Sequence, residues 1–192
     1  DILVKQGAKI NAVGTPDKPI VMTSEKEEPG AWGGIHICGK AHTNAEGGKG
    51  SSEIGGAVYG GNDDADNSGT LQYIRLEYTG FAFDEEHEAN GISFYGVGNG
   101  TIVDHCEAYK GSDDGFEFFG GSVNVSNMVV VSCSDDSFDW TEGWNGKGTN
   151  LVAYQEDKST LGYDCDCLME CDNNGSNNAA TPVAHPVLKN LI

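Results

Sequence analysis

Apolar residues along the chain occur in short runs that alternate with polar positions, and each run ends at a cluster of turn-forming residues. The runs lie at residues 20–22, 35–37, 71–76, 92–94, 116–118 and 129–131. Glycine, asparagine, aspartate and serine fill the intervals, and these residues favour turns through positive φ angles and side-chain-to-backbone hydrogen bonds. The pattern predicts an all-β protein made of many short strands with a turn after each.

One segment of the chain repeats, and the repeat distinguishes between β architectures. Residues 112–118 read SDDGFEF and residues 134–140 read SDDSFDW, an offset of 22 residues. At about 3.3 Å per residue such a repeat has a contour of roughly 70 Å, which suits one coil of three short strands with their turns. An antiparallel sandwich also uses short strands but gives no reason for the fixed spacing. We therefore expect a parallel β-helix, a solenoid of stacked coils.

Stacking the repeats in register predicts which side chains fill the core. Equivalent residues of neighbouring coils lie about 4.8 Å apart. The expected inward ladder is apolar and consists of Ile92, Phe94, Phe116, Phe118, Phe138 and Trp140. The residues between them, Ser93, Glu117 and Asp139, are expected to face outward.

Composition narrows the class of protein. The chain has 192 residues with 30 acidic and 11 basic side chains, a formal net charge of -19. This deficit of Lys and Arg argues against a partner made of nucleic acid or anionic membrane, and no run approaches the ~18 apolar residues of a membrane span. We expect one domain over residues 1–192, with long loop excursions near 40–67 and 171–185.

Several stretches resemble a large family of secreted right-handed parallel β-helix proteins, common in marine and gut bacteria and mostly without an assigned activity. The resemblance lies in residues 14–15, 19–24, 29–35, 59–61, 68–71 and 113–121, the last reading DDGFEFFGG. It implies the right-handed fold and export to the cell surface or the medium. Because such proteins have coils before and after this region, the chain is expected to be a fragment of a longer solenoid.

The six cysteines agree with an exported protein, where they are expected to form disulfides or remain free thiols. Cys165, Cys167 and Cys171 are clustered. With His185 they could bind zinc, but the Cys-Xaa-Cys-Xaa3-Cys spacing lacks the usual Cys-Xaa2-Cys pair. The pairing cannot be deduced from the sequence.

Repeated carboxylates are the strongest sign of chemistry. In the predicted register, three carboxylates of one coil lie beside three equivalent carboxylates of the next coil. The set comprises Asp113, Asp114, Glu117, Asp135, Asp136 and Asp139. Like charges about 5 Å apart repel by roughly 3 kcal/mol at an effective dielectric constant near 20. Either these side chains splay into water or a cation lies between them, and calcium suits such a set of oxygen ligands.

The Asp-Asp-Gly-Xaa-Asp/Glu pattern is also similar to the calcium-binding segment of one β-helical pectate lyase family. The resemblance implies Asp113, Asp114, Glu117 and Asp135 as calcium ligands, with a Lys or Arg as the base. No basic residue here matches that base. Arg75 is the only arginine, and Lys110 and Lys147 are the nearest lysines. No catalytic residue is therefore assigned.

A second calcium candidate is the acidic loop that begins with Asp64 and Asp66. Its side chains with oxygen atoms stand at loop positions one, three and five, before Gly69. An EF-hand would need Glu at the twelfth loop position, which is Arg75, so no EF-hand is expected. A calcium-binding acidic loop and a metal-free network of Asx turns remain equal alternatives.

These observations favour an extracellular, calcium-stabilised β-helical scaffold with a surface, adhesive or glycan-binding role. Trp32, Trp144 and Tyr95 could stack on sugars if they are exposed. The alternatives are a calcium-dependent polysaccharide lyase and a filament subunit that associates end to end through strand edges.

Overall fold

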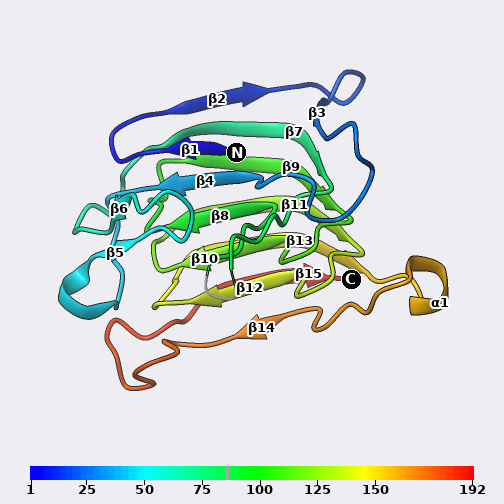
Figure 1. Cartoon of the computed structure of the whole chain (residues 1–192). Helices are drawn as coiled ribbons and strands as arrows, with labels where there is room; N and C mark the ends of the chain where they lie inside the picture. The colour runs from blue at the N-terminus through cyan, green and yellow to red at the C-terminus, as the bar shows by residue number, and fades with distance from the viewer. Residues whose placement is uncertain (85–86) are drawn as a thin grey trace.

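The fold is a parallel β-helix, as the repeat predicted. The computed structural model describes residues 1–84 and 87–192. Figure 1 shows the coils stacked from the N-terminal strands to the C-terminal strands. Helical structure in the described residues is confined to α1 (Lys158–Leu161) and the single turn η1 (Glu46–Gly48). Among these residues no helix is long and apolar enough to cross a membrane.

Two parallel sheets run along the stack, and we name them by the length of their strands. The short-strand sheet contains β1 (Ile2–Val4), β4 (Ile35–Cys38), β8 (Ile92–Tyr95), β10 (Phe116–Phe119), β12 (Phe138–Thr141) and β14 (Glu170–Cys171), in that order. The long-strand sheet contains β2 (Ile10–Val13), β3 (Ile20–Met22), β7 (Gly69–Glu77), β9 (Ile102–Tyr109), β11 (Asn124–Val131), β13 (Lys147–Tyr154) and β15 (Val187–Leu191). A separate antiparallel hairpin joins β5 (Gly50–Ser51) to β6 (Val58–Tyr59).

The predicted inward ladder is confirmed residue by residue. Phe116 pairs with Ile92 on one side and Phe138 on the other, and Phe118 pairs with Phe94 and Trp140. All six side chains are buried. The ring of Phe118 stacks on Phe94 at 5.0 Å and on Trp144 at 4.1 Å. The core is therefore a column of aromatic rings along the solenoid axis.

Five strands of the long-strand sheet, β7, β9, β11, β13 and β15, each contain one residue other than glycine with a positive φ angle. These residues occupy one row and are Tyr73, His105, Asn127, Asn150 and Asn190, with φ between 53° and 57°. Asparagine tolerates this left-handed conformation better than most residues. The row is further joined by side chains, because Asn150 donates to Asn127 (2.7 Å) and Asn190 donates to Asn150 (2.8 Å).

This asparagine row yields a testable expectation. Asn150→Ala should lower the free energy of unfolding by about 1–2 kcal/mol, because alanine is strained at positive φ and cannot make the two amide hydrogen bonds. Asn150→Gly is the matched control, since glycine relieves the strain and loses only the hydrogen bonds. Urea denaturation should show a smaller loss for the glycine variant. Equal losses would contradict the role given to the left-handed backbone.

The excursion over residues 39–68 covers the outer face of the short-strand sheet. Ala57 and Tyr59 of this excursion pack on Cys38, Tyr95 and Phe119 to form a second apolar cluster. Two expectations are corrected by the burial of side chains on this sheet. Tyr95 is fully buried beneath the excursion, and Ser93 beside it is buried rather than solvent-facing.

Trp144, a second residue proposed for sugar stacking, is also buried. Trp144 is 1% exposed because its ring lies against Phe118 in the core and its indole N–H donates to the backbone oxygen of Val123. The indole of Trp32 is half-buried and donates to the backbone oxygen of Glu77. Trp144 and Tyr95 therefore offer no face to a glycan.

All six cysteines are free thiols, the second of the two alternatives that the sequence left open. Cys38, Cys106 and Cys133 are buried, and burial raises the pKa of Cys106 and of Cys133 to about 12. Such thiols behave as small apolar side chains.

Candidate metal centre

The centre of the acidic site is a row of outward side chains on the short-strand sheet. Because successive side chains of a strand alternate between faces, Glu117 points away from a core that holds Phe116 and Phe118. The strand register then places Glu117 opposite Asp139, and Asp139 opposite Glu170. Three carboxylates thus stand side by side on consecutive coils.

A second row of carboxylates, Asp114 and Asp136, lies in the turns that precede these strands. The carboxylate of Asp114 accepts the backbone N–H of Asp136 (2.9 Å), and Asp136 accepts that of Cys167 (2.7 Å). Asn90 occupies the same place one coil earlier and accepts the N–H of Asp114 (3.1 Å). The repeated Asp-Asp motif therefore has a structural role, since one side-chain oxygen in each coil fixes the turn of the next.

The two rows enclose a cavity of about 230 Å³ whose lining is entirely acidic. Its lining residues are Glu53, Glu88, Asp113, Asp114, Glu117, Asp135, Asp136, Asp139 and Glu170. All six carboxylates of the repeated motif therefore line one cavity.

Carboxylate oxygens come close enough to share a cation at three places in this cavity. In each group one oxygen per residue lies within 4.8 Å of the others. The groups are Asp113 with Asp114 and Asp135, Asp114 with Glu117 and Asp139, and Asp136 with Asp139 and Glu170. Neighbouring groups share Asp114 and Asp139, so the oxygens form a continuous row.

Burial and mutual repulsion both disfavour the ionised forms of these acids. Burial first, and the carboxylates around it second, raise the pKa of Asp113 to about 8. The same causes raise the pKa of Glu117 well above its usual range, and its side chain accepts a 2.6 Å hydrogen bond from the amide of Asn90. Burial raises the pKa of Asp139 to about 6, and its buried Oδ1 has no hydrogen-bond partner among the described residues.

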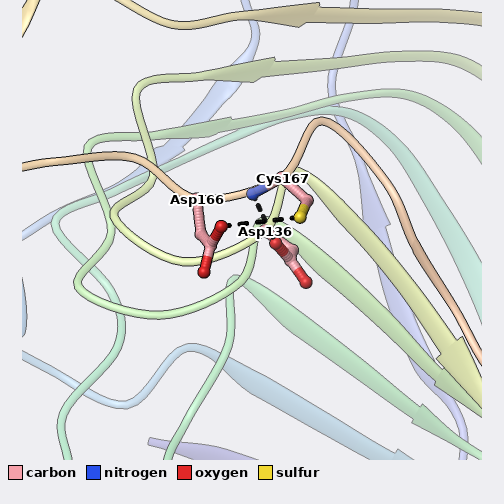
Figure 2. Close-up of side chains that lie close together, drawn as sticks. All are labelled: Asp136, Asp166 and Cys167. Carbon is pink, nitrogen blue, oxygen red and sulfur yellow. Dashed lines mark hydrogen bonds between the residues drawn. The ribbon is translucent and has the colours of Figure 1, made fainter.

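A fourth group lies at the edge of the site and includes a thiol. Figure 2 shows Asp166 and Cys167 approaching Asp136, with the backbone N–H of Cys167 donating to Asp136 at 2.7 Å. The Cys167 thiol is exposed and lies 3.5 Å from Asp166 Oδ1. The zinc hypothesis gains no support, because no ligand group among the described residues joins the clustered cysteines to His185.

The second calcium candidate has a different arrangement. Asp64 Oδ1 lies 2.7 Å from Nδ1 of His42 and also accepts the His42 backbone N–H, and Asp66 accepts the backbone N–H of Lys40. Burial alone would raise the pKa of Asp64, but the hydrogen bonds from His42 outweigh it and lower this pKa. Neither aspartate joins a group of three possible ligands in the described part of the chain, and the carboxylates of both accept hydrogen bonds from the segment at Lys40 and His42.

Sequence reasoning missed three carboxylates of the cavity. Glu170 lies 31 residues after Asp139 rather than 22, because the segment between them carries α1, and this longer interval hides its place in the repeat. Glu53 and Glu88 reach the cavity from segments outside the repeat. The tyrosine hydroxyl of Tyr95 donates to Glu53 (3.4 Å), and burial raises the pKa of that glutamate to about 7.

The three basic residues considered as a catalytic base lie outside the acidic cavity. Lys110 pairs with Glu156 at 3.2 Å, and Arg75 pairs with Glu77 and Glu107. Lys147 is an exposed residue at the start of β13. None of the three lines the acidic cavity.

The two parallel sheets that run along the stack of coils define the class of protein, the parallel β-helix proteins. The chain belongs to the family described as the pectate-lyase like beta helix domain, whose model matches residues 1–192. No curated protein and no solved structure matches the chain.

Proposed function

We propose that this protein is an extracellular β-helical scaffold, adhesive or glycan-binding, in which calcium bound in the acidic cavity links neighbouring coils. The observation that carries the proposal is the cavity lining, which among the described residues consists of nine carboxylates and no basic residue. Desolvated like charges destabilise a fold unless they are protonated or share a cation. A divalent cation would replace repulsion between coils by attraction.

Calcium fits this site better than other divalent ions on chemical grounds. It takes six to eight oxygen ligands at about 2.3–2.6 Å in flexible geometry, whereas magnesium needs near-ideal octahedral geometry and keeps its water. The row of oxygens shared through Asp114 and Asp139 is irregular and rich in carboxylates. The exposed Cys167 thiol lies outside the nine lining residues, so the cavity itself has only hard ligands.

Direct binding measurements test the proposal. Isothermal titration with calcium should show binding to the metal-free protein, and Asp139→Asn should weaken the affinity by about tenfold or more, because Asp139 belongs to two of the three ligand groups. The control is Asp17→Asn, which removes the same charge from an exposed turn. Unchanged calcium affinity in the Asp139 variant, or equal losses in both variants, would refute the site.

The family description and the acidic site also favour a second candidate, a calcium-dependent polysaccharide lyase. That reaction needs a base near the cation, and the cavity lining contains no Lys or Arg. Incubation with polygalacturonate and calcium is therefore expected to give no unsaturated product absorbing in the near ultraviolet. Calcium-dependent turnover that is abolished by Lys110→Ala or Lys147→Ala would establish the lyase instead.

A further inference from the structure

A second, larger cavity lies on the same outer face of the short-strand sheet, two residues further along β10 and β12. Its volume is about 580 Å³, within the usual range for sites of small ligands. The residues of its wall that matter here are Phe119, Thr141, Glu142, Asn174, Ser176 and Asn177. Unlike the acidic cavity, it combines an aromatic ring with neutral polar side chains.

The hollow arises where a stack of aromatic rings ends. Tyr95 and Phe119 are paired in register, and their rings stack at 4.4 Å with an interplanar angle of 17°. The next residue in this row is Thr141, whose side chain is too short to cover a phenyl ring. Phe119 is 8% exposed, its ring stacks on Tyr95, and both Phe119 and Thr141 are among the residues that line the cavity.

The polar wall is held in place before any ligand arrives. The Glu142 carboxylate accepts hydrogen bonds from the hydroxyls of Thr43 (2.6 Å) and Tyr59 (3.0 Å). A carboxylate has about four acceptor positions, so Glu142 retains capacity for further donors. On the other wall, the amide of Asn174 donates to Asn44 (2.9 Å), which fixes the loop that carries Ser176.

We propose that this cavity binds a neutral sugar ring of a glycan, with the ring stacked on Phe119. The C–H groups of a pyranose are weakly positive and complement the negative face of a phenyl ring. The sugar hydroxyls donate to Glu142 and pair with the side chains of Ser176 and Asn177. The proposal rests on the glycan-binding part of the proposed function and locates it away from Tyr95 and Trp144.

The charges around the cavity select against acidic sugars. Glu142 and Glu46 line it, and Asp172 adjoins it through a 3.2 Å hydrogen bond from Thr141. Burial raises the pKa of Glu142, although hydrogen bonds from Thr43 and Tyr59 favour its ionised form. A uronate would add a further carboxylate to this environment, so a neutral hexose should bind better than the corresponding uronate.

A substitution that fills the cavity tests the proposal without removing the Phe119 ring that lines it. Thr141→Phe would continue the aromatic row and occupy the cavity, whereas Thr141→Val removes only the hydroxyl and serves as the matched control. Isothermal titration should use neutral gluco-, manno- and galacto-oligosaccharides with trigalacturonate as the acidic counterpart. We expect at least one neutral oligosaccharide to bind at millimolar or lower concentration, more tightly than trigalacturonate. Thr141→Phe should weaken binding about tenfold or more and Thr141→Val only slightly.

The outcomes separate this site from the cation site. Sugar binding that survives chelation of calcium but is lost in Thr141→Phe supports the proposal independently of the metal. No binding by any neutral oligosaccharide, tighter binding of trigalacturonate, or unchanged affinity in Thr141→Phe would overturn it. Circular dichroism of Thr141→Phe should match the wild-type protein, because the added ring enters an existing hollow. If that spectrum changes, Asn177→Ala in the exposed wall serves as the second variant, and its unchanged affinity would overturn the proposal.

Discussion

In the presence of a chelator, the protein is expected to lose several kcal/mol of stability as the pH rises from about 4 to about 8. The change comes from the acidic cavity, where the pKa of Asp136 and that of Asp139 are raised to about 6 and that of Asp113 to about 8. Burial is the main cause in each case. One pKa unit corresponds to about 1.4 kcal/mol, so Asp113 alone would give an effect of several kcal/mol.

The direction of the change follows from proton binding. Unfolded Asp and Glu titrate near pH 4, so between pH 4 and 8 the folded protein holds more protons in this cavity than the unfolded chain does. Stability falls with pH wherever the folded state binds more protons. The contribution of Asp113, Asp136 and Asp139 is therefore fully present below about pH 4 and is lost as the pH rises through their folded pKa values, up to about pH 8.

Calcium should reverse this loss. A cation bound only by the folded protein stabilises it by about 2.7 kcal/mol at one hundred times the dissociation constant, and it favours the ionised carboxylates. The increase in melting temperature caused by calcium should thus be small at pH 5 and reach several degrees at pH 8. Differential scanning calorimetry in calcium and in chelator, across this range, measures both effects.

A double variant provides a control that the chain itself suggests. Asp114→Asn with Asp136→Asn removes two charges but keeps the oxygens that accept the backbone N–H groups, as Asn90 already does one coil earlier. In chelator at pH 8 this variant should be more stable than the wild-type protein, and its response to calcium should be much smaller. A melting temperature in chelator that does not vary with pH, or a full calcium response in the variant, would contradict the account.

The sequence was sufficient for the fold because the repeat constrains both the coil and its register. Once residues 112–118 and 134–140 are aligned, the partners of Phe116 and Phe118 follow, and the structure has those pairs. The same alignment brings Glu117 opposite Asp139. Properties that depend on neighbouring coils alone are thus readable from a periodic sequence.

Properties that depend on the excursions were not readable in this way. The burial of Tyr95 depends on residues 39–68, which fold back over the sheet through contacts without a repeat. Glu53 enters the cavity by the same route. The Asp64 loop was ambiguous because its partner, His42, lies 22 residues away with no pattern linking the two. An acidic motif shows which residues gather but not what covers them.

The second large effect is expected from the aromatic column. Phe118→Ala should lower the free energy of unfolding by about 3–5 kcal/mol, the usual cost of truncating a buried phenylalanine. Phe118 is 1% exposed, and its ring lies between Phe94 and Trp144 at nearly parallel angles of 9° and 13°. Alanine would leave a cavity that rings stacked in consecutive coils cannot fill without breaking the strand register.

The position of Phe118 in the middle of the stack makes this loss a test of the solenoid itself. In a repeat protein each coil contacts mainly its neighbours, so a defect in β10 weakens the connection between the coils before and after it. Two of the three tryptophans, Trp140 and Trp144, lie next to the defect. Urea unfolding followed by tryptophan fluorescence should therefore show the transition at lower urea than far-ultraviolet circular dichroism does. The matched control is Phe83→Ala, which makes the same truncation at a side chain that is 63% exposed and should cost less than about 1 kcal/mol. Similar losses at Phe118 and Phe83 would mean that the aromatic column does not carry the stability of the fold.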